Sequence, residues 1–358
     1  MVRGVEMLTI VAGAVASYGG LAPVCIAGQE STRSDGGQKG TIPAVWPGAS
    51  TALRAVPGAA RFQPLGLSMV RPYVRGKVPV VFVHGLWGSP RNWAGMIGAL
   101  EADAFLSERY QALTFGYSGG SSITYSAYEL RREFQSLRHR LDGAHEVQAW
   151  DRTILVGHSM GGLLSKLMVQ DSGSTLWDLM ARRPFEKLAG PTDARDLLRR
   201  ELVFEPVAEV RRLIFVATPH RGSPLVCGAV KEFGSRLVAP PERLRQARAA
   251  LLASNDSGAF TPNFLAGLAT SLDQLAWDSP LLLAINRLPI EPDIKRHSII
   301  ADQGRYPGPG KGDGLVPYVS AHHFGATSEL IVNAGHVCLD NPEVIREVAR
   351  ILKEHATP

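Results

Sequence analysis

Short apolar runs alternate with amphipathic stretches along most of this chain. The run at residues 78–83 (Val-Pro-Val-Val-Phe-Val) is continuous and rich in β-branched residues, which indicates a strand buried on both faces. Residues 126–141 place Leu130, Phe134, Leu137 and Leu141 at helical spacing, which predicts an amphipathic helix. The same patterns predict further strands at residues 112–115, 153–156, 213–216, 297–300 and 329–332, and further helices at residues 92–102, 160–169 and 341–352.

This alternation predicts an α/β fold: a mostly parallel sheet with helices on both faces. Residues 172–210 and 225–295 separate consecutive strands by far more than one helix. We interpret both segments as insertions that form a helical cap over one end of the sheet. The second is rich in leucine and phenylalanine, which fits either ordinary helical packing or the lining of an apolar substrate cleft. The folded domain is expected to span residues 65–358.

The N-terminal residues have a different composition. Residues 8–27 carry no charge, but several glycines and Pro23 interrupt this stretch. Residues 1–27 are interpreted as an export leader or, alternatively, as an atypical N-terminus. Export or membrane association is therefore expected, with a cytoplasmic location as the alternative. Residues 28–64 are rich in Gly, Ser, Thr and Pro and are predicted to form a flexible linker.

Composition excludes several classes of protein. Of the 358 residues, 45% are hydrophobic and 20% are charged, a balance typical of globular proteins. The net charge of +5 is spread along the chain, so nucleic acid is not expected as a partner. Three cysteines, Cys25, Cys227 and Cys338, cannot build a disulfide framework. A bridge between Cys227 and Cys338 stays open for an exported protein, and three unpaired thiols are the other interpretation.

The clearest chemical signal is the segment Gly157-His158-Ser159-Met160-Gly161, which lies between a predicted strand and a predicted helix. This is the G-x-S-x-G pattern in the context that a strained turn with an exposed nucleophilic serine requires. Gly157 and Gly161 leave room for the turn, and the helix N-terminus favours developing negative charge. Ser159 is the candidate nucleophile.

A nucleophilic serine needs a base, and the base needs a carboxylate that orients it. On this kind of fold the chain order is serine, acid, histidine. His336 follows the last predicted strand and is the candidate base, with His297, His322 and His323 as rivals. Asp313, in a Gly-rich loop, is the candidate acid, and Asp302 is its main competitor.

The segment His84-Gly85-Leu86 follows the first buried strand. The backbone N–H groups of Leu86 and Met160 are the candidate oxyanion hole, because main-chain donors at a strand end can face the serine. His84, Gly85, Gly157, His158 and Gly161 are expected to support the site, and His84 to orient the loop rather than transfer a proton. Thr218, His220 and Arg221 lie in the loop after a predicted strand. We expect them to brace this loop through hydrogen bonds rather than to contact the substrate.

These motifs, together with Gly312-Asp-Gly-Leu-Val-Pro317 and Phe215-Val-Ala-Thr-Pro-His-Arg-Gly-Ser223, resemble the α/β-hydrolase superfamily, in particular its lipase-like and acyl-transferring branches. The resemblance covers roughly residues 75–355. It implies hydrolysis of an acyl bond through Ser159, His336 and Asp313, with no cofactor. It does not specify a substrate.

The resulting hypothesis is a serine ester hydrolase, either a carboxylesterase or a lipase-like enzyme, acting on a small-molecule or lipid ester. Thioesterase, amidase or acyltransferase chemistry on the same three residues is the alternative, and a non-catalytic binding protein is a remote one. A membrane surface is a further candidate partner. The sequence does not determine the oligomeric state. No metal is implied, because the sequence contains neither a D-x-D-x-D-G loop nor H-E-x-x-H spacing.

Overall fold

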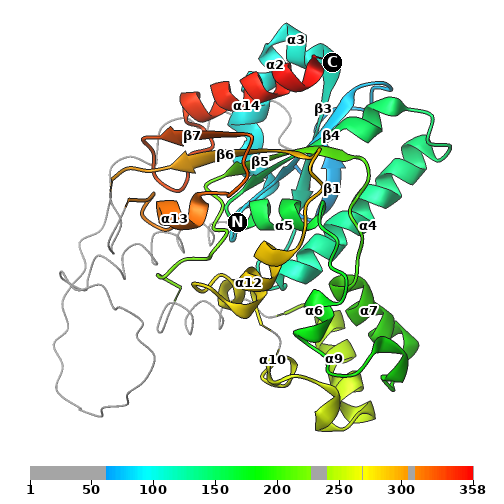
Figure 1. Ribbon diagram of the computed structural model, residues 1–358. Helices are drawn as coiled ribbons and strands as arrows, with labels where there is room; N and C mark the ends of the chain where they lie inside the picture. The colour runs from blue at the N-terminus through cyan, green and yellow to red at the C-terminus, as the bar shows by residue number, and fades with distance from the viewer. Residues whose placement is uncertain (1–61, 227–239, 268, 305–310, 358) are drawn as a thin grey trace, which may run out of the picture.

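A seven-stranded sheet crosses the molecule in the order β1-β3-β2-β4-β5-β6-β7 (Figure 1). The structure is a computed structural model that describes residues 62–226, 240–267, 269–304 and 311–357. The edge strand β1 runs antiparallel to β3, and every other neighbouring pair is parallel. The strands are β1 (Gly66–Met69), β2 (Val78–Val83), β3 (Tyr110–Gly116), β4 (Thr153–His158), β5 (Val210–Val216), β6 (Lys295–Ala301) and β7 (Ser328–Val332).

Helices cover both faces of this sheet, as the hydrophobic pattern predicted. Successive residues of β2 point to opposite faces, so Val81 and Val83 join one apolar core while Val80 and Phe82 join the other. The first core is covered by α4 (Ile123–Asp142) and α5 (Met160–Leu167). The second is covered by α2 (Ala94–Ala102), α3 (Ala104–Arg109) and α14 (Pro342–Ala356). The predicted α/β class with a mostly parallel sheet is confirmed.

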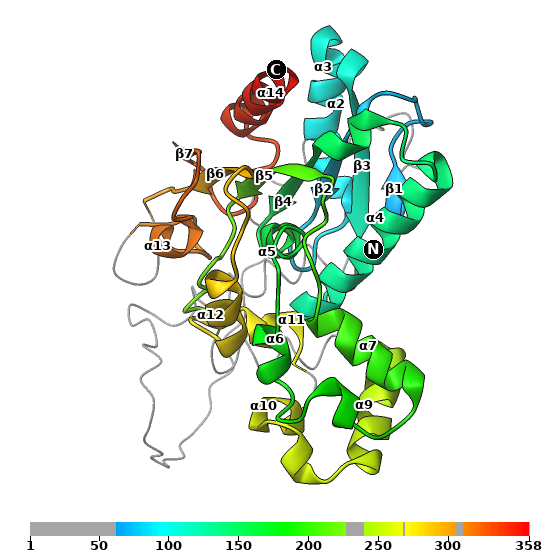
Figure 2. The same ribbon diagram turned by 45° about the vertical axis from the view of Figure 1, so that its right-hand side comes forward.

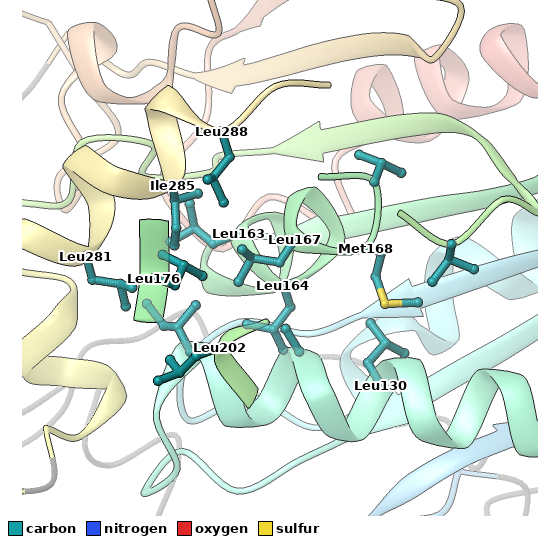
Figure 3. Close-up of a cluster of buried hydrophobic side chains, with 14 of the residues drawn as sticks. Leu130, Leu163, Leu164, Leu167, Met168, Leu176, Leu202, Leu281, Ile285 and Leu288 are labelled. Atoms are coloured by element: carbon teal, nitrogen blue, oxygen red, sulfur yellow. The ribbon is translucent and has the colours of Figure 1, made fainter. Parts of the chain in front are cut away.

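The two long insertions contribute short helices that gather on one side of the molecule, away from α2, α3 and α14 (Figure 2). The first insertion holds α6 (Thr175–Asp178) and α7 (Thr192–Leu202). The described part of the second holds α9 (Glu242–Ser254), α10 (Pro262–Leu265), α11 (Ser271–Gln274) and α12 (Pro280–Arg287). Leucine and isoleucine side chains from α6, α7 and α12 pack against those of α5 in a single apolar cluster (Figure 3). The insertions therefore rest directly on the helix that follows Ser159.

Several elements differ from the sequence prediction. The expected helix over residues 92–102 is preceded by a 3₁₀ turn, η2 (Pro90–Trp93), and begins as an α-helix only at Ala94. Strand β1 was not expected, because its four residues are all half-buried and show no alternation. The short α3 was also not expected. The remaining short elements are η3 (Gln148–Arg152), η4 (Phe185–Lys187), η5 (Ser257–Ala259) and α13 (Tyr318–Ala321).

Some predictions concern residues outside the described ranges. These are the leader at residues 1–27, nearly all of the linker at 28–64, and the cysteines Cys25 and Cys227. Cys338 is described and is a free, buried thiol, whose pKa burial raises to about 12. Across the described ranges, no helix combines the length and the apolar character that a membrane span needs.

Candidate active site

The three residues singled out as nucleophile, acid and base meet at the carboxyl end of the parallel strands. Ser159 follows β4, Asp313 lies between β6 and α13, and His336 follows β7. The Oγ atom of Ser159 lies 2.8 Å from Nε2 of His336. The Nδ1 atom of His336 lies 2.7 Å from Oδ2 of Asp313. One continuous hydrogen-bonded chain therefore joins three residues that are far apart in the sequence.

The turn at Ser159 is strained in the way the glycine pattern predicted. Ser159 has a φ of 52°, in the left-handed region, and its N–H donates to the carbonyl of Val216 at 2.8 Å. A Cβ on Gly161 would lie 2.2 Å from the carbonyl oxygen of Val83, and one on Gly157 would lie 2.5 Å from that of Gly161. Only glycine fits at both positions. The crowding holds Ser159 at the N-terminus of α5, which begins at Met160.

Backbone hydrogen bonds hold the carboxylate of Asp313 in place. Its Oδ1 accepts from the N–H groups of Leu315 at 2.9 Å and Val316 at 2.7 Å, which leaves Oδ2 for His336. The Asp313 carbonyl in turn accepts the N–H of His336 at 3.1 Å. The competitor Asp302 has a different position, because its Oδ1 accepts the N–H groups of Gly304 and Gly312 and braces that loop. The structure thus brings Asp313, and not Asp302, to the imidazole.

His84 and His158 surround this chain as buried, neutral side chains. Burial lowers the pKa of His84 to about 4 and that of His158 to about 3. Nδ1 of His84 lies 2.8 Å from the carbonyl oxygen of Gly85, and Nε2 of His84 accepts the N–H of Tyr117 at 3.3 Å. His158 donates through Nε2 to the carbonyl of His336 at 2.9 Å. Both histidines therefore bind loop backbone, which fits the orienting role expected for His84.

The rival histidines have other partners in the described structure. His297 lies at the opposite end of the sheet, with its Nε2 2.8 Å from Nη1 of Arg212. His322 binds Glu329 at 2.7 Å, and His323 packs edge-on against the ring of His220. Among the histidines of the described residues, only His336 forms a hydrogen bond with Ser159.

The loop after β5 braces the site. A Cβ on Gly162 would lie 1.9 Å from Oγ1 of Thr218, so this threonine packs directly against α5. Arg221 forms two hydrogen bonds to Asp278, and the carbonyl of His220 accepts from Asn286 at 2.8 Å. Arg221 and the backbone of His220 are therefore held by hydrogen bonds. Oγ1 of Thr218 and both ring nitrogens of His220 have no hydrogen-bond partner in the described structure, so bracing by these two side chains stays a prediction.

Ser159 and His336 open into an apolar cavity of about 120 Å³, called here the Ser159 cavity. Its apolar walls include Leu86, Leu225, Leu272, Leu275, Val316 and Leu339. Leu272 and Leu275 come from the second insertion, so part of that leucine-rich segment does line the cavity beside Ser159. The leucines at 265 and 283, by contrast, are exposed.

The loop that contains Leu86 lies directly against Ser159. A Cβ on Gly85 would lie only 2.9 Å from the Cβ of Ser159. Leu86 lines the Ser159 cavity. Met160 is the first residue of α5, so its N–H has no acceptor within the helix. Both candidate oxyanion donors are thus next to the serine.

Tyr117 supports this loop and was missed by the sequence analysis. Its ring stacks on that of His84 with the centroids 4.2 Å apart, and its hydroxyl donates to the His84 carbonyl at 2.7 Å. A single tyrosine after a strand has no pattern that would distinguish it from a core residue. Within the described ranges, no group of three or more His, Cys, Asp or Glu side chains could hold a metal ion.

Comparison with known proteins defines the class. The model of the alpha/beta hydrolase family matches residues 80–348, and the chain therefore belongs to this family. Among solved structures, the mature lipase BlEst2 of Bacillus licheniformis is similar, with 16% identity, a TM-score of 0.45, and coverage of 81% of this chain and 98% of that one.

Two further solved structures are similar at the level of the fold. Lipase 1 from Pelosinus fermentans has 14% identity and a TM-score of 0.47, with 80% of this chain and 100% of that one covered. Esterase B from Lactobacillus rhamnosis has 14% identity and a TM-score of 0.43, with 81% and 79% covered. No curated protein matches the sequence.

Proposed function

We propose that this protein is a serine hydrolase of carboxylic esters that acts through an acyl-enzyme on Ser159. The observation that carries the proposal is the hydrogen-bonded chain from Ser159 through His336 to Asp313, with links of 2.8 Å and 2.7 Å. Both distances are within hydrogen-bonding reach, which a serine nucleophile and its base require. Membership of the alpha/beta hydrolase family supports hydrolysis as the reaction class.

In the proposed mechanism, Oγ of Ser159 attacks the ester carbonyl while Nε2 of His336 takes its proton. His336 then gives this proton to the departing alcohol. A water molecule, deprotonated by His336, attacks the acyl-enzyme and releases the acid. Asp313 keeps Nδ1 of His336 protonated and stabilises the imidazolium, because its Oδ2 accepts a hydrogen bond there and its Oδ1 is already held by two backbone donors.

Negative charge develops on the ester oxygen at each attack. The N–H groups of Leu86 and Met160 are proposed to stabilise it. Gly85 holds the Leu86 loop close to the serine, and Met160 adds the positive end of the α5 dipole. Both donors belong to rigid backbone, so little reorganisation is needed when charge appears.

The Ser159 cavity indicates the kind of ester. Its volume of about 120 Å³ is well below the roughly 300–1,000 Å³ of pockets that enclose a whole drug-sized ligand. We infer that it holds only the acyl half of the substrate. Since half of its lining residues are leucine or valine, a short apolar acyl chain fits it best.

The test is hydrolysis of p-nitrophenyl esters from acetyl to palmitoyl by the wild type and by Ser159→Ala. The wild type should be most active on short chains. Loss of the nucleophile should lower kcat by roughly 10⁶-fold, the effect found when a triad serine is removed. Ser118→Ala, an exposed serine, is the matched control and should retain activity.

Two results would contradict the proposal. Ester hydrolysis that persists in Ser159→Ala would exclude this serine as the nucleophile. A folded wild type that a serine-reactive phosphonate labels at Ser159, but that hydrolyses no ester, would reject ester hydrolysis in favour of amide or acyl-transfer chemistry. An optimum at palmitoyl would reject the short acyl chain alone.

A further inference from the structure

A second cavity lies at the amino end of the parallel strands, at the opposite end of β2 from His84. Its volume is about 280 Å³, and we call it the Lys77 cavity. Its walls come from the loop between β1 and β2, from β2 and β3, and from α2, α3 and α14. These three helices lie together on the side of the molecule away from the insertions (Figure 2). The Lys77 cavity shares no lining residue with the Ser159 cavity, so the two are separate.

The buried part of the lining is apolar. Six large side chains of the second apolar core contribute to it: Val80, Phe82, Ile97, Leu100, Leu106 and Leu352. The cavity is therefore open space at the margin of this core. Its volume is close to the lower end of the roughly 300–1,000 Å³ of pockets that enclose organic ligands. A small molecule with an apolar chain is the kind of ligand that such a lining fits.

Polar side chains from the β1–β2 loop and from α2 and α3 form the more exposed part of the lining. Arg71 donates through Nε and Nη2 to the carboxylate of Glu101, and the shortest of these contacts is 2.6 Å. The ammonium group of Lys77 donates to the carbonyl of Ser107. Both contacts join the β1–β2 loop to the two helices. They place two cationic groups and one carboxylate beside an apolar interior.

Two further polar side chains of the lining are already hydrogen-bonded within the protein. Oε1 of Gln111 accepts the N–H of Val74 at 3.2 Å, and its Nε2 donates to the carbonyl of Arg71 at 3.2 Å. The hydroxyl of Tyr110 donates to the carbonyl of Leu352 at 2.6 Å. Neither side chain therefore has a donor left for a ligand head group.

Lys77 differs from these groups, because it keeps donors that the protein does not use. An ammonium group has three N–H donors, and the Ser107 carbonyl takes one. Within the described ranges, Glu101 is the only acidic residue of the lining, and it is already bound by Arg71. Lys77 forms no ion pair there, so the polar part of the lining carries one positive charge in excess. This excess favours an anionic head group, since charge-assisted hydrogen bonds are the stronger ones.

We propose that the Lys77 cavity binds a short aliphatic monocarboxylate. Its carboxylate accepts hydrogen bonds from the ammonium group of Lys77, and its chain packs against the apolar part of the lining. The head group lies at the exposed side of the cavity, where it keeps part of its hydration, while the chain is removed from water. The inference does not rest on the proposed ester hydrolysis.

The experiment measures binding of hexanoate, n-hexanol and n-hexylammonium by calorimetry to full-length Ser159→Ala, so that catalysis plays no part. Hexanoate should bind most tightly and hexylammonium least. Adding Lys77→Met removes the ammonium group and keeps an apolar side chain. It should weaken hexanoate binding by about tenfold or more, the effect of losing a hydrogen bond to a charged group, and leave hexanol binding unchanged. Lys187→Met, an exposed lysine outside the lining, is the matched control.

A second variant tests the apolar part of the cavity and keeps the proposal testable if Lys77→Met unfolds. Ala112, on β3, is half-buried, lines the cavity and packs against the second apolar core. Ala112→Leu should fill part of the space and weaken hexanoate and hexanol together, with folding checked by thermal melts. The proposal is overturned if hexanoate binds no better than hexanol, or if either variant, while folded, binds hexanoate as tightly as its parent. Hexanoate bound in the Ser159 cavity would give this last result, because neither residue lines that cavity.

Discussion

Two groups of histidines lie at opposite ends of the same sheet. At the carboxyl end, His336 is bound to Asp313 and Ser159 and faces an apolar cavity. At the amino end, His297 and His355 surround Arg212. Helix α14 connects the two regions, because it begins shortly after His336 and its last turn contains His355. Similar side chains are thus arranged for two different purposes.

The group next to each imidazole explains the difference. Arg212 donates through Nε to Nδ1 of His355 at 3.2 Å, and its Nη1 lies 2.8 Å from Nε2 of His297. Arginine stays charged, so it occupies the lone pair with which each imidazole could accept a proton. Burial is the main reason that the pKa values of His297 and His355 are lowered to about 4. The positive charge of Arg212 is the second reason. A carboxylate at His336 does the opposite: it accepts from Nδ1 and leaves Nε2 for the serine.

Among the changes that separate the two ends of the sheet, the largest effect is expected from the carboxylate at the carboxyl end. Asp313→Asn should lower kcat on a short-chain ester by about 10⁴-fold, because the amide no longer favours the tautomer that can accept the serine proton. The matched control is Asp302→Asn, whose side chain braces a loop and contacts neither Ser159 nor His336 in the described structure. Steady-state kinetics on both variants decide the assignment. Equal losses in the two would contradict a special role for Asp313.

Acid should destabilise the fold through its buried neutral histidines. His84 has an ordinary pKa of 6.5 when unfolded and a pKa of about 4 when folded, so the unfolded chain takes up the proton first. The free energy of unfolding therefore falls as the pH drops from about 6.5 to about 4, and His84 alone accounts for about 3 kcal/mol. Urea denaturation at several pH values measures this. His84→Gln should flatten the dependence, whereas the exposed His139→Gln should not; parallel curves for all three proteins would reject the assignment.

Arg212 should matter for stability and not for catalysis. Arg212→Leu leaves the buried imidazoles of His297 and His355 without their donor and removes the ion pair to Glu354. Since Glu354 is half exposed, we expect a loss of about 2–3 kcal/mol in the free energy of unfolding, below the range for a fully buried pair. Arg211→Leu, an exposed neighbour on the same strand, should change stability by less than about 0.5 kcal/mol. A fall in kcat for Arg212→Leu at a temperature where it is folded would show that the two ends are coupled.

The smallest effect concerns the helix that connects the two groups. Asn341 caps α14, with its Oδ1 accepting the N–H groups of Glu343 at 2.7 Å and Val344 at 3.4 Å. Asn341→Ala should lower the free energy of unfolding by about 1 kcal/mol and leave kcat unchanged. Asn341→Asp retains the cap and should restore stability in thermal melts. A drop in kcat for Asn341→Ala would mean that α14 also positions His336.

The hydrophobic pattern predicted the strands β2 to β7 and the covering helices α2, α4, α5 and α14, because apolar runs and helical spacing are local properties of the chain. It failed at β1, which is too short to show a period, and at η2, where Pro90 starts a 3₁₀ turn before the helix. The strained turn at Ser159 was also predictable, since the glycines on either side of it indicate the crowding directly. The order of the strands in the sheet was not, because pairing depends on contacts between distant segments.

The sequence by itself therefore determined the fold class and the candidates Ser159, His336 and Asp313, because each follows a strand whose apolar pattern is local. Only the tertiary structure decided between Asp313 and Asp302, since both are aspartates in one Gly-rich loop region and differ in which backbone donors surround them. It also decided the wall of the Ser159 cavity. Leu272 and Leu275 reach this wall from the second insertion, and no local pattern records which distant segments meet there.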